Sequence, residues 1–254
     1  MVILQKIIEK FEEFAPPELA GEWDNVGLMV GDFENDIKKA VVVLDVTAAV
    51  IDFAIENKCE LIVSHHPFIM SLGKSMAYDT HLNKMIYKLI KNDISVYSMH
   101  TNFDSCSEGV NSVICDMLDL DYTKDETNII WSGKLKKEKT LAEFIEMVKT
   151  TFCVNAVSYS GDLSKKINAV AVCGGGGGSF IDMAKFEINA DVYFTGEVKY
   201  HDFQHGLSID LPIVTAGHFE TENPSLYKIR DLLKSLKIEV AETDLHKGFS
   251  QINV

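Results

Sequence analysis

The chain has few basic residues for its length, and that scarcity excludes several kinds of protein. Among 254 residues there are 24 Lys and Arg against 38 Asp and Glu, a formal net charge of −14. Such a chain repels phosphate backbones at long range, so nucleic acid is not expected as a partner. Proline is scarce, at 5 residues, and hydrophobic residues make up 46%, which excludes collagen-like and disordered chains.

Cysteine and long apolar runs are also sparse. The five cysteines are odd in number and form no C-x-x-C pair, so neither a disulfide framework nor a zinc ribbon is indicated. No apolar run approaches the roughly 18 residues of a membrane span. Residues 1–14 alternate apolar and charged side chains at helical spacing and do not form a signal peptide. These absences predict a cytoplasmic protein with reduced thiols and no membrane association.

Strand-like and helix-like segments alternate along the chain. The β-branched run at 40–46 predicts a strand buried on both faces, followed by a helix at 47–59 and a strand at 60–64. Further helices are expected at 2–14, 80–91, 105–118, from Thr140 on, at 179–189 and at 222–237, with strands at 94–99, 156–160, 167–173, 191–195, 212–216 and 238–242. The order predicts an α/β fold of two similar βαβ-based halves with mostly parallel sheets.

The least ordered-looking stretch between the halves is 119–133, which places the two expected domains at 1–126 and 127–254. Each half carries a histidine and a carboxylate four residues apart, directly after a predicted strand. These pairs are His100 with Asp104 and His218 with Glu222. Residues i and i+4 share a face when a loop enters a helix, so the two side chains of each pair can converge on one point.

Metal-type side chains gather where predicted strands end, which is the edge at which α/β proteins bind ligands. Beside the two pairs, His65 and His66 stand together after the strand at 60–64. These residues exceed the needs of one four-coordinate ion, so a dinuclear site is expected. The predicted direct ligands are His65, His66, Asp104, His218 and Glu222, with His100 orienting a ligand or a substrate. Imidazole and carboxylate together admit Zn, Fe or Mn.

Two further segments leave alternatives open. The run of five glycines at 174–178, followed by Ser179, comes between a strand and a helix. The amides of Gly175, Gly176, Gly177 and Ser179 either bind an anion or form a tight turn where backbone passes close to backbone. The segment 195–203 supplies Glu197 and His201, which either face the metals and the substrate or begin a solvated helix.

The stretch 23–32 is expected to form turns between a helix and a strand. Within it, Trp23 is predicted to be a core residue rather than a platform for a ligand. Asp24 and Asn25 are candidates to reach the site.

Taken together, the chain resembles the Nif-three-like family, whose bacterial members are named GTP cyclohydrolase 1 type 2 homologues. The matching stretches are WDNVGLMVGD, LIVSHHPF, HTNFDS, CGGGGGS, TGEVKYHD and GHFETE, in the family's order over nearly the whole chain. The resemblance implies a two-domain α/β subunit with a dinuclear metal site between its halves. It also implies a ring-shaped homohexamer, and it assigns the metal ligands to the five residues predicted above.

Two functions are open at this point. The first is a metal-dependent hydrolase that opens the purine ring of GTP or cleaves a phosphoester, with His100, Glu197 or His201 as general acid or base. The second is a non-catalytic hexamer that handles metal or serves as a regulatory scaffold. A site that keeps open coordination positions favours catalysis, and five ligands for two ions leave several positions open.

Overall fold

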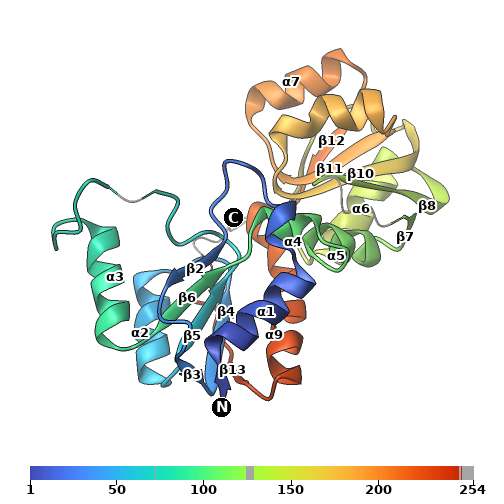
Figure 1. The fold of residues 1–254 in the computed structure, drawn as a ribbon. Coiled ribbons are helices and arrows are strands. Elements are labelled where there is room, and N and C mark those ends of the chain that lie inside the picture. The colour runs from blue at the N-terminus through green and yellow to red at the C-terminus, as the bar shows by residue number, and fades with distance from the viewer. Residues whose placement is uncertain (72, 124–128, 246, 248–254) are drawn as a thin grey trace. The chain divides into compact units, whose positions relative to one another are not determined.

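The computed structural model describes residues 1–71, 73–123, 129–245 and 247, which fold into two compact units (Figure 1). Unit 1 comprises residues 1–103 and the described residues from Leu226 on, and unit 2 comprises residues 104–225. The boundary expected at 126/127 lies outside the described residues. The compact units divide the chain after residues 103 and 225, and the C-terminal segment returns to unit 1.

Unit 1 is built on a five-stranded sheet in the order β13-β4-β5-β6-β2. Its strands are β2 (Gly27–Val30), β4 (Lys39–Val43), β5 (Leu61–Ser64), β6 (Ser95–Ser98) and β13 (Glu239–Ala241), with β1 (Val2–Ile3) and β3 (Asp36–Ile37) forming a separate antiparallel pair. Neighbours from β13 to β6 run parallel, and β2 is antiparallel to β6 at the edge. The sheet is therefore mostly parallel, as the alternating pattern predicts.

Helices cover both faces of this sheet. They are α1 (Leu4–Phe14), α2 (Ala48–Glu56), α3 (His81–Lys91) and α9 (Leu226–Ser235), with a short 3-10 turn, η1, at Pro17–Leu19. Apolar residues of α2 and α3 share one core cluster with β4, β5 and β6. On the other face Phe11 of α1 stacks against Tyr97 of β6, with ring centroids 5.1 Å apart. The predicted helix start at Thr47 is confirmed, because its side chain accepts a hydrogen bond from the amide of Val50.

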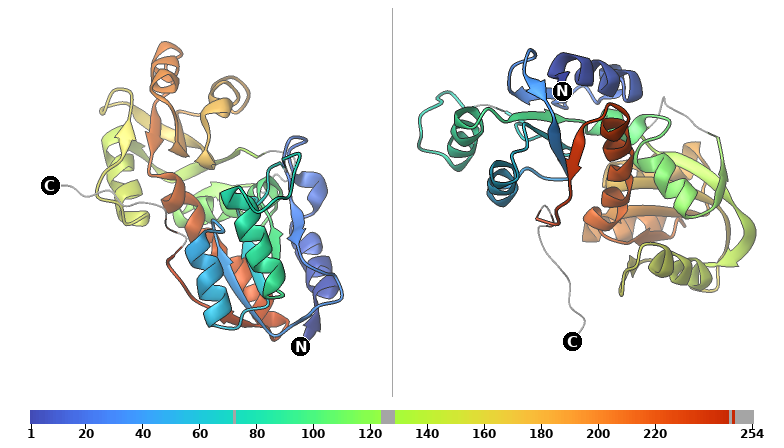
Figure 2. Two further views of the ribbon diagram at one scale, coloured as in Figure 1. Left: turned by 90° about the vertical axis from the view of Figure 1, so that its left-hand side faces the viewer. Right: turned by 90° about the horizontal axis from the view of Figure 1, so that it is seen from below.

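The last strand explains why the C-terminal segment belongs to unit 1. Strand β13 pairs in parallel with β4, in the register Val240 to Ala40, and the two strands lie side by side in Figure 2. About 200 residues of sequence separate the paired strands, counting from Ala40 to Val240. Strand 238–242 was expected from its own residues, but its partner depends on a long-range pairing that local periodicity does not report.

Unit 2 contains a mixed six-stranded sheet in the order β7-β8-β10-β11-β12-β9. The strands are β7 (Leu120–Tyr122), β8 (Trp131–Thr140), β9 (Ser158–Tyr159), β10 (Lys166–Gly176), β11 (Val192–Glu197) and β12 (Ile213–Thr215). Only β10, β11 and β12 run parallel to one another. The remaining pairings, β7–β8, β8–β10 and β12–β9, are antiparallel, so the prediction of a mostly parallel sheet is wrong for this unit.

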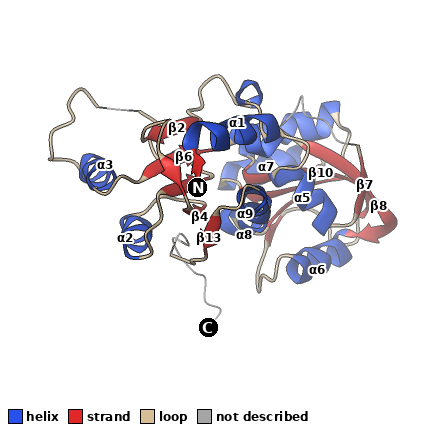
Figure 3. Cartoon of the chain, turned by 60° about the horizontal axis from the view of Figure 1, so that its bottom comes forward, coloured by secondary structure: helices blue, strands red, loops and turns tan. Residues whose placement is uncertain are grey.

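The helical segments of unit 2 are α4 (Thr101–Ser105, which begins in unit 1), α5 (Val110–Met117), α6 (Leu141–Thr151), η2 (Gly178–Phe180), η3 (Met183–Glu187), α7 (Tyr200–Ser208), α8 (His218–Glu222) and η4 (Asn223–Ser225). Helix α6 packs on one face of the sheet, where Phe144 lies 6.3 Å from Phe194 between ring centroids. The π-helix η3 and α7 cover the other face, and Figure 3 shows α6 and α7 on opposite sides of the sheet. The capping box predicted at Thr140 is confirmed. The Thr140 hydroxyl accepts a hydrogen bond from the Glu143 amide, and the Glu143 carboxylate accepts one from the Thr140 amide.

Three strands lie where turns or little order were expected. Strand β2 falls inside the stretch 23–32, β7 lies inside 119–133, and β8 begins inside 119–133. Of the residues 131–140, only Trp131 and Leu135 are buried, so the segment has no clear alternation of apolar side chains. Its place is fixed by hydrogen bonding to β7 and β10 on either side.

None of the five cysteines forms a disulfide, as predicted, and four of the five are buried. Burial raises the pKa of the Cys59 thiol to about 11 and raises those of Cys115 and Cys173 further, which makes these thiols poor nucleophiles. Among the described residues, no helix has the length and apolar character needed to cross a membrane.

Candidate metal centre

Three histidines meet at the carboxyl edge of the sheet in unit 1. His65 and His66 directly follow β5, and His100 follows β6, its parallel neighbour. The ring centroid of His65 lies 5.1 Å from that of His66 and 5.3 Å from that of His100. One ring nitrogen of each residue lies within 4.8 Å of the others, a spacing from which all three can bind metal. The structure thus groups His100 with the two predicted ligands.

Each of these rings is held through its Nδ1 atom. His65 Nδ1 lies 2.9 Å from the carbonyl oxygen of Met99, His66 Nδ1 lies 2.9 Å from Asp45 Oδ1, and His100 Nδ1 lies 2.9 Å from Asp24 Oδ1. A carbonyl or a carboxylate only accepts hydrogen bonds, so we assign the ring proton to Nδ1 in every case. In the neutral rings the lone pair is then on Nε2, the form in which histidine binds a metal.

Asp45, the partner of His66, was missed by the sequence reasoning. The parallel register sets Val43 beside Ser64, so Asp45 and His66, two residues further along, leave the sheet together. The sequence did contain a signal for this contact. Asp45 follows a buried strand, and the next strand along the chain ends in two histidines.

Asp24 was a candidate to reach the site, and the structure joins it to His100. Its side chain is fully buried and also accepts hydrogen bonds from the amide and hydroxyl of Thr101, at 3.0 and 2.5 Å. Burial alone would raise the pKa of Asp24, but the hydrogen bonds from His100 and Thr101 outweigh burial and hold this pKa well below its usual range. Asp24 is therefore a carboxylate at neutral pH and fixes the orientation of His100.

Unit 2 gathers carboxylates and one histidine. His218 and Glu222 lie four residues apart on α8, with His218 Nε2 3.1 Å from Glu222 Oε1. A carboxylate oxygen of Asp104, on α4, lies within 4.8 Å of one of Glu222. Asp104 and Glu222 are both buried, at 7% and 3% exposure. Buried carboxylates this close together need a positive charge nearby or protonation, which is the environment that a bound cation supplies.

Glycine at the end of β10 makes room for these side chains. Gly175 has a φ of +62°, and a Cβ atom there would stand 2.0 Å from Glu222 Oε1 and 3.1 Å from His218 Nε2. A Cβ on Gly174 would stand 2.5 Å from Val110 of α5. The glycines therefore let the strand end approach α8 and α5 more closely than any other residue would.

The contacts of the glycine run bear on the two alternatives left open by the sequence. The amide of Gly175 donates to Thr221 Oγ1, and the amide of Gly177 donates to the carbonyl of Glu197. These two amides already have acceptors within the protein, which supports the close-approach alternative for them. Anion binding by Gly176 and Ser179 stays a prediction.

Glu197 and His201 line a cavity of about 480 Å³ in unit 2, with Gly176, Gly178, Ser179, Val198, Lys199 and Asp202 as its other walls. Glu197 Oε1 lies 3.0 Å from His218 Nδ1, so this carboxylate orients a predicted ligand. The His201 side chain is 75% exposed, with Nε2 3.5 Å from Asp202 Oδ1. A proton-transfer role for either residue stays a prediction.

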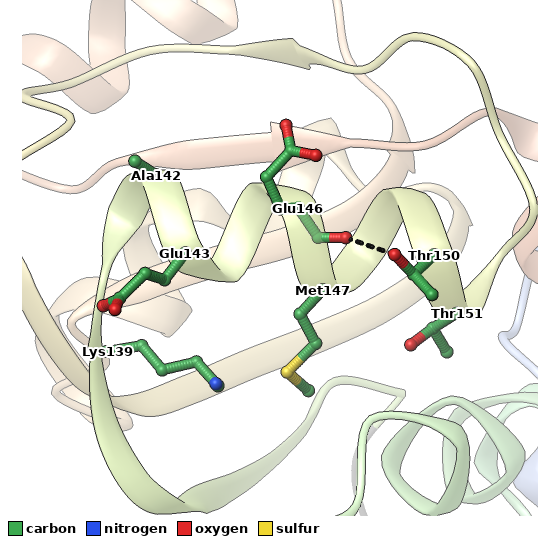
Figure 4. A pocket seen from close by; sticks show the side chains of 7 residues that line it. All are labelled: Lys139, Ala142, Glu143, Glu146, Met147, Thr150 and Thr151. Atoms are coloured by element: carbon green, nitrogen blue, oxygen red, sulfur yellow. Dashed lines mark hydrogen bonds between the residues drawn. The ribbon is translucent and has the colours of Figure 1, made fainter.

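A larger groove, of about 600 Å³, runs along α6 between Lys139 and Thr151 (Figure 4). Its walls include Glu143, Glu146 and Met147, and the Glu146 carbonyl accepts a hydrogen bond from the Thr150 hydroxyl. None of the predicted site residues lines this groove, so the size of a cavity does not identify the site in this unit.

The prediction that Trp23 is a core residue is wrong. Its side chain is 67% exposed, and its indole ring meets the ring of His100 edge to face, with centroids 5.9 Å apart. The turn from Gly21 to Asp24 explains the exposure, because Asp24 is held inside by His100 and Thr101 and the preceding residue points outward.

Comparison with known proteins identifies the family and the fold of the chain. A "GTP cyclohydrolase 1 type 2 homolog" of Clostridium acetobutylicum is 37% identical over 245 residues, covering 93% of this chain and 88% of the relative. Reduced HcgD from Methanocaldococcus jannaschii is 30% identical, and its structure matches with a TM-score of 0.84 over 96% of this chain and 98% of that one. A Bacillus cereus protein related to NIF3 has the same fold, with a TM-score of 0.87 at 24% identity and 99% coverage of both chains. The model of the Duf34/NIF3 (NGG1p interacting factor 3) family matches residues 2–248, and the chain belongs to this family.

Proposed function

We propose that the protein is a hydrolase with two divalent metal ions, which acts on a nucleotide or a phosphoester. The observation that carries the proposal is the set of three histidines in unit 1, each with Nδ1 engaged and the lone pair on Nε2. Three imidazoles lie together at the carboxyl edge of the sheet, and two of them have a carboxylate partner that is buried or partly buried. Removing these carboxylates from water costs free energy. Metal binding is the function that this arrangement serves best.

Residues of each unit would serve as metal ligands. We assign the ligands to His65 and His66 from unit 1 and to Asp104, His218 and Glu222 from unit 2. Imidazole and carboxylate donors suit Zn, Fe and Mn alike. The buried carboxylates of Asp104 and Glu222 would offset the positive charge of the ions.

Divalent ions held by these ligands would supply Lewis-acid activation of water near neutral pH. The chain's own groups hold and move the protons. Asp24 keeps the His100 proton on Nδ1, so that Nε2 is available to accept a proton or to bind substrate. His201, exposed on the cavity wall of unit 2, is a candidate to donate a proton to a leaving group. Glu197 keeps the His218 proton on Nδ1.

The names of the relatives support the choice of substrate class. Several are named GTP cyclohydrolase 1 type 2 homologues, so we propose attack on the purine ring of a guanine nucleotide as the first reaction to test. Phosphoester hydrolysis uses the same ions and is the second. We further propose a homohexamer as the working assembly, which sedimentation of the purified protein would test.

The experiment is metal analysis of the purified protein and of three variants, His65→Ala, Glu222→Ala and His81→Ala. His81 is exposed on α3 and lies outside the candidate centre, so its variant is the matched control. The same samples are assayed for GTP ring opening and for phosphatase and phosphodiesterase activity. If the two sets share one centre, about two ions per chain are expected in the wild type, and either ligand variant weakens binding of both.

The outcomes separate the alternatives. Loss of metal and of one activity in both ligand variants, but not in His81→Ala, supports the proposal. Loss of a single ion in each variant, with the other ion held normally, indicates two separate sites. Bound metal without any turnover favours a protein that handles metal, and absence of metal from the wild type contradicts the metal centre altogether.

A further inference from the structure

Trp23 is unusual among the aromatic residues because it is both exposed and adjacent to the histidine set. Its side chain is 67% exposed, whereas Trp131, the second tryptophan of the chain, is 1% exposed. Exposing an indole forgoes a large gain from burial, so a tryptophan in such a place calls for an explanation. The turn that carries it is anchored by the buried Asp24, and Trp23 is therefore displayed by a rigid part of the fold.

The neighbours of Trp23 define what it can bind. The His100 ring lies 5.9 Å from the indole at an interplanar angle of 80°, and His100 itself lies 5.3 Å from His65 and 5.7 Å from His66. The indole also lies against Gly21, where a Cβ atom would stand 3.0 Å from its Nε1. Because Trp23 is 67% exposed, these two contacts leave much of the indole accessible to a ligand. A planar molecule that stacks there is brought beside the imidazoles that we assign to the metal centre.

We infer that Trp23 is the stacking platform for the heteroaromatic base of the substrate. The inference rests on the proposed function and narrows it, because it places the base, rather than a phosphate group, next to the histidines. Aromatic stacking accepts any planar base, so Trp23 would position the ring while other groups select it. Of the two reactions proposed above, attack on the purine ring is the one that needs this arrangement.

The test compares nucleotide binding by the wild type and by Trp23→Leu, Trp23→Phe and Phe33→Leu. Phe33 is an exposed aromatic residue of the same unit with no contact to the histidine set among the ring contacts found, so its variant is the matched control. The probes are GMP and ribose 5-phosphate, which lacks the base, measured by equilibrium dialysis on metal-containing protein. Subtracting the fluorescence of Trp23→Phe, in which only Trp131 remains, from that of the wild type isolates the emission of Trp23.

We expect GMP to quench the Trp23 emission and ribose 5-phosphate to leave it unchanged. Trp23→Leu should bind GMP roughly 5- to 150-fold more weakly, the range that one base–aromatic stack of about 1–3 kcal/mol gives, and Trp23→Phe should lose less. Metal content and ribose 5-phosphate binding should be the same in all variants. Phe33→Leu should match the wild type throughout.

Other results overturn the inference in distinguishable ways. Equal GMP affinity in the wild type and Trp23→Leu contradicts stacking and leaves the proposed function standing. Loss of metal in Trp23→Leu shows that Trp23 supports the histidines instead, and a change of oligomeric state in that variant shows that it packs against another copy. If neither probe binds to metal-containing wild type, the nucleotide and phosphoester function fails, and the stacking role fails with it.

Discussion

The two units prepare their metal-type residues by different means. In unit 1 hydrogen bonds orient three imidazoles, through Asp24, Asp45 and the Met99 carbonyl. In unit 2 the absence of a side chain at Gly175 leaves the space that Glu222 and His218 occupy. Hydrogen bonds hold the histidines of unit 1, whereas space left by the backbone holds the side chains of unit 2. We therefore expect metal binding to fall gradually when a hydrogen-bond partner in unit 1 is changed, and sharply when the space in unit 2 is filled.

The largest effect is expected from Gly175→Ala. The new Cβ would collide with Glu222 Oε1, and the φ of +62° disfavours any side chain. We expect loss of metal binding and a fall of about 2–4 kcal/mol in the free energy of unfolding, from strain and the displaced α8. Urea unfolding and metal analysis measure the two effects.

Gly176→Ala is the matched control for this prediction. A Cβ on Gly176 meets nothing within 4 Å, and its φ lies outside the left-handed region. Gly176→Ala should bind metal normally, and its free energy of unfolding should differ from that of the wild type by less than about 1 kcal/mol. Equal behaviour of the two variants would show that close approach at Gly175 is not what shapes the carboxylate set.

The contrast also explains what the sequence could predict. The segments that hold His65, His100 and His218 were found because metal-type residues directly follow strands, a local pattern. The contact between His218 and Glu222 followed from helical spacing and is confirmed. Asp45 was missed because its partner lies on the neighbouring strand, and only the register of β4 with β5 brings them together.

Long-range pairing also accounts for the differences in the fold. Strand β8 carries charged residues at half of its positions, so hydrophobic periodicity does not reveal it, and its neighbours in the sheet fix its conformation. The return of β13 to unit 1 depends on a partner strand far away in sequence. Trp23 was expected in the core because tryptophan is usually buried, and a local turn overrides that preference.

An intermediate effect is expected from Asp45→Asn, which tests the hydrogen-bonded set. The amide keeps the size of the carboxylate but removes the negative charge that orients His66. Metal affinity should fall about 10- to 100-fold, the usual cost of losing a partner of a ligating histidine, with little change in fold. Competition with a chromophoric chelator measures the affinity.

The control for Asp45→Asn is Asp52→Asn, which removes an exposed carboxylate paired with Lys88 in the same unit. Its metal affinity should equal that of the wild type. A similar loss in both variants would mean that overall charge, rather than the bond to His66, governs binding. An unchanged affinity in Asp45→Asn would remove His66 from the ligand set or show that its orientation is fixed by packing alone.

The smallest effect is expected from Asp24→Asn, and it depends on pH. Hydrogen bonds from His100 and Thr101 hold the pKa of Asp24 below its value in the unfolded chain, about 3.9. A lowered pKa stabilises the fold at pH values above the unfolded pKa, and this contribution disappears as the pH falls through the folded pKa. The measurement is urea unfolding in the presence of a chelator, which removes any effect of bound metal. Near neutral pH the free energy of unfolding of the wild type should exceed that of Asp24→Asn by about 1–2 kcal/mol. The difference should shrink below about pH 4, so a difference that stays constant into strong acid would show that Asp24 acts through packing and not through its charge.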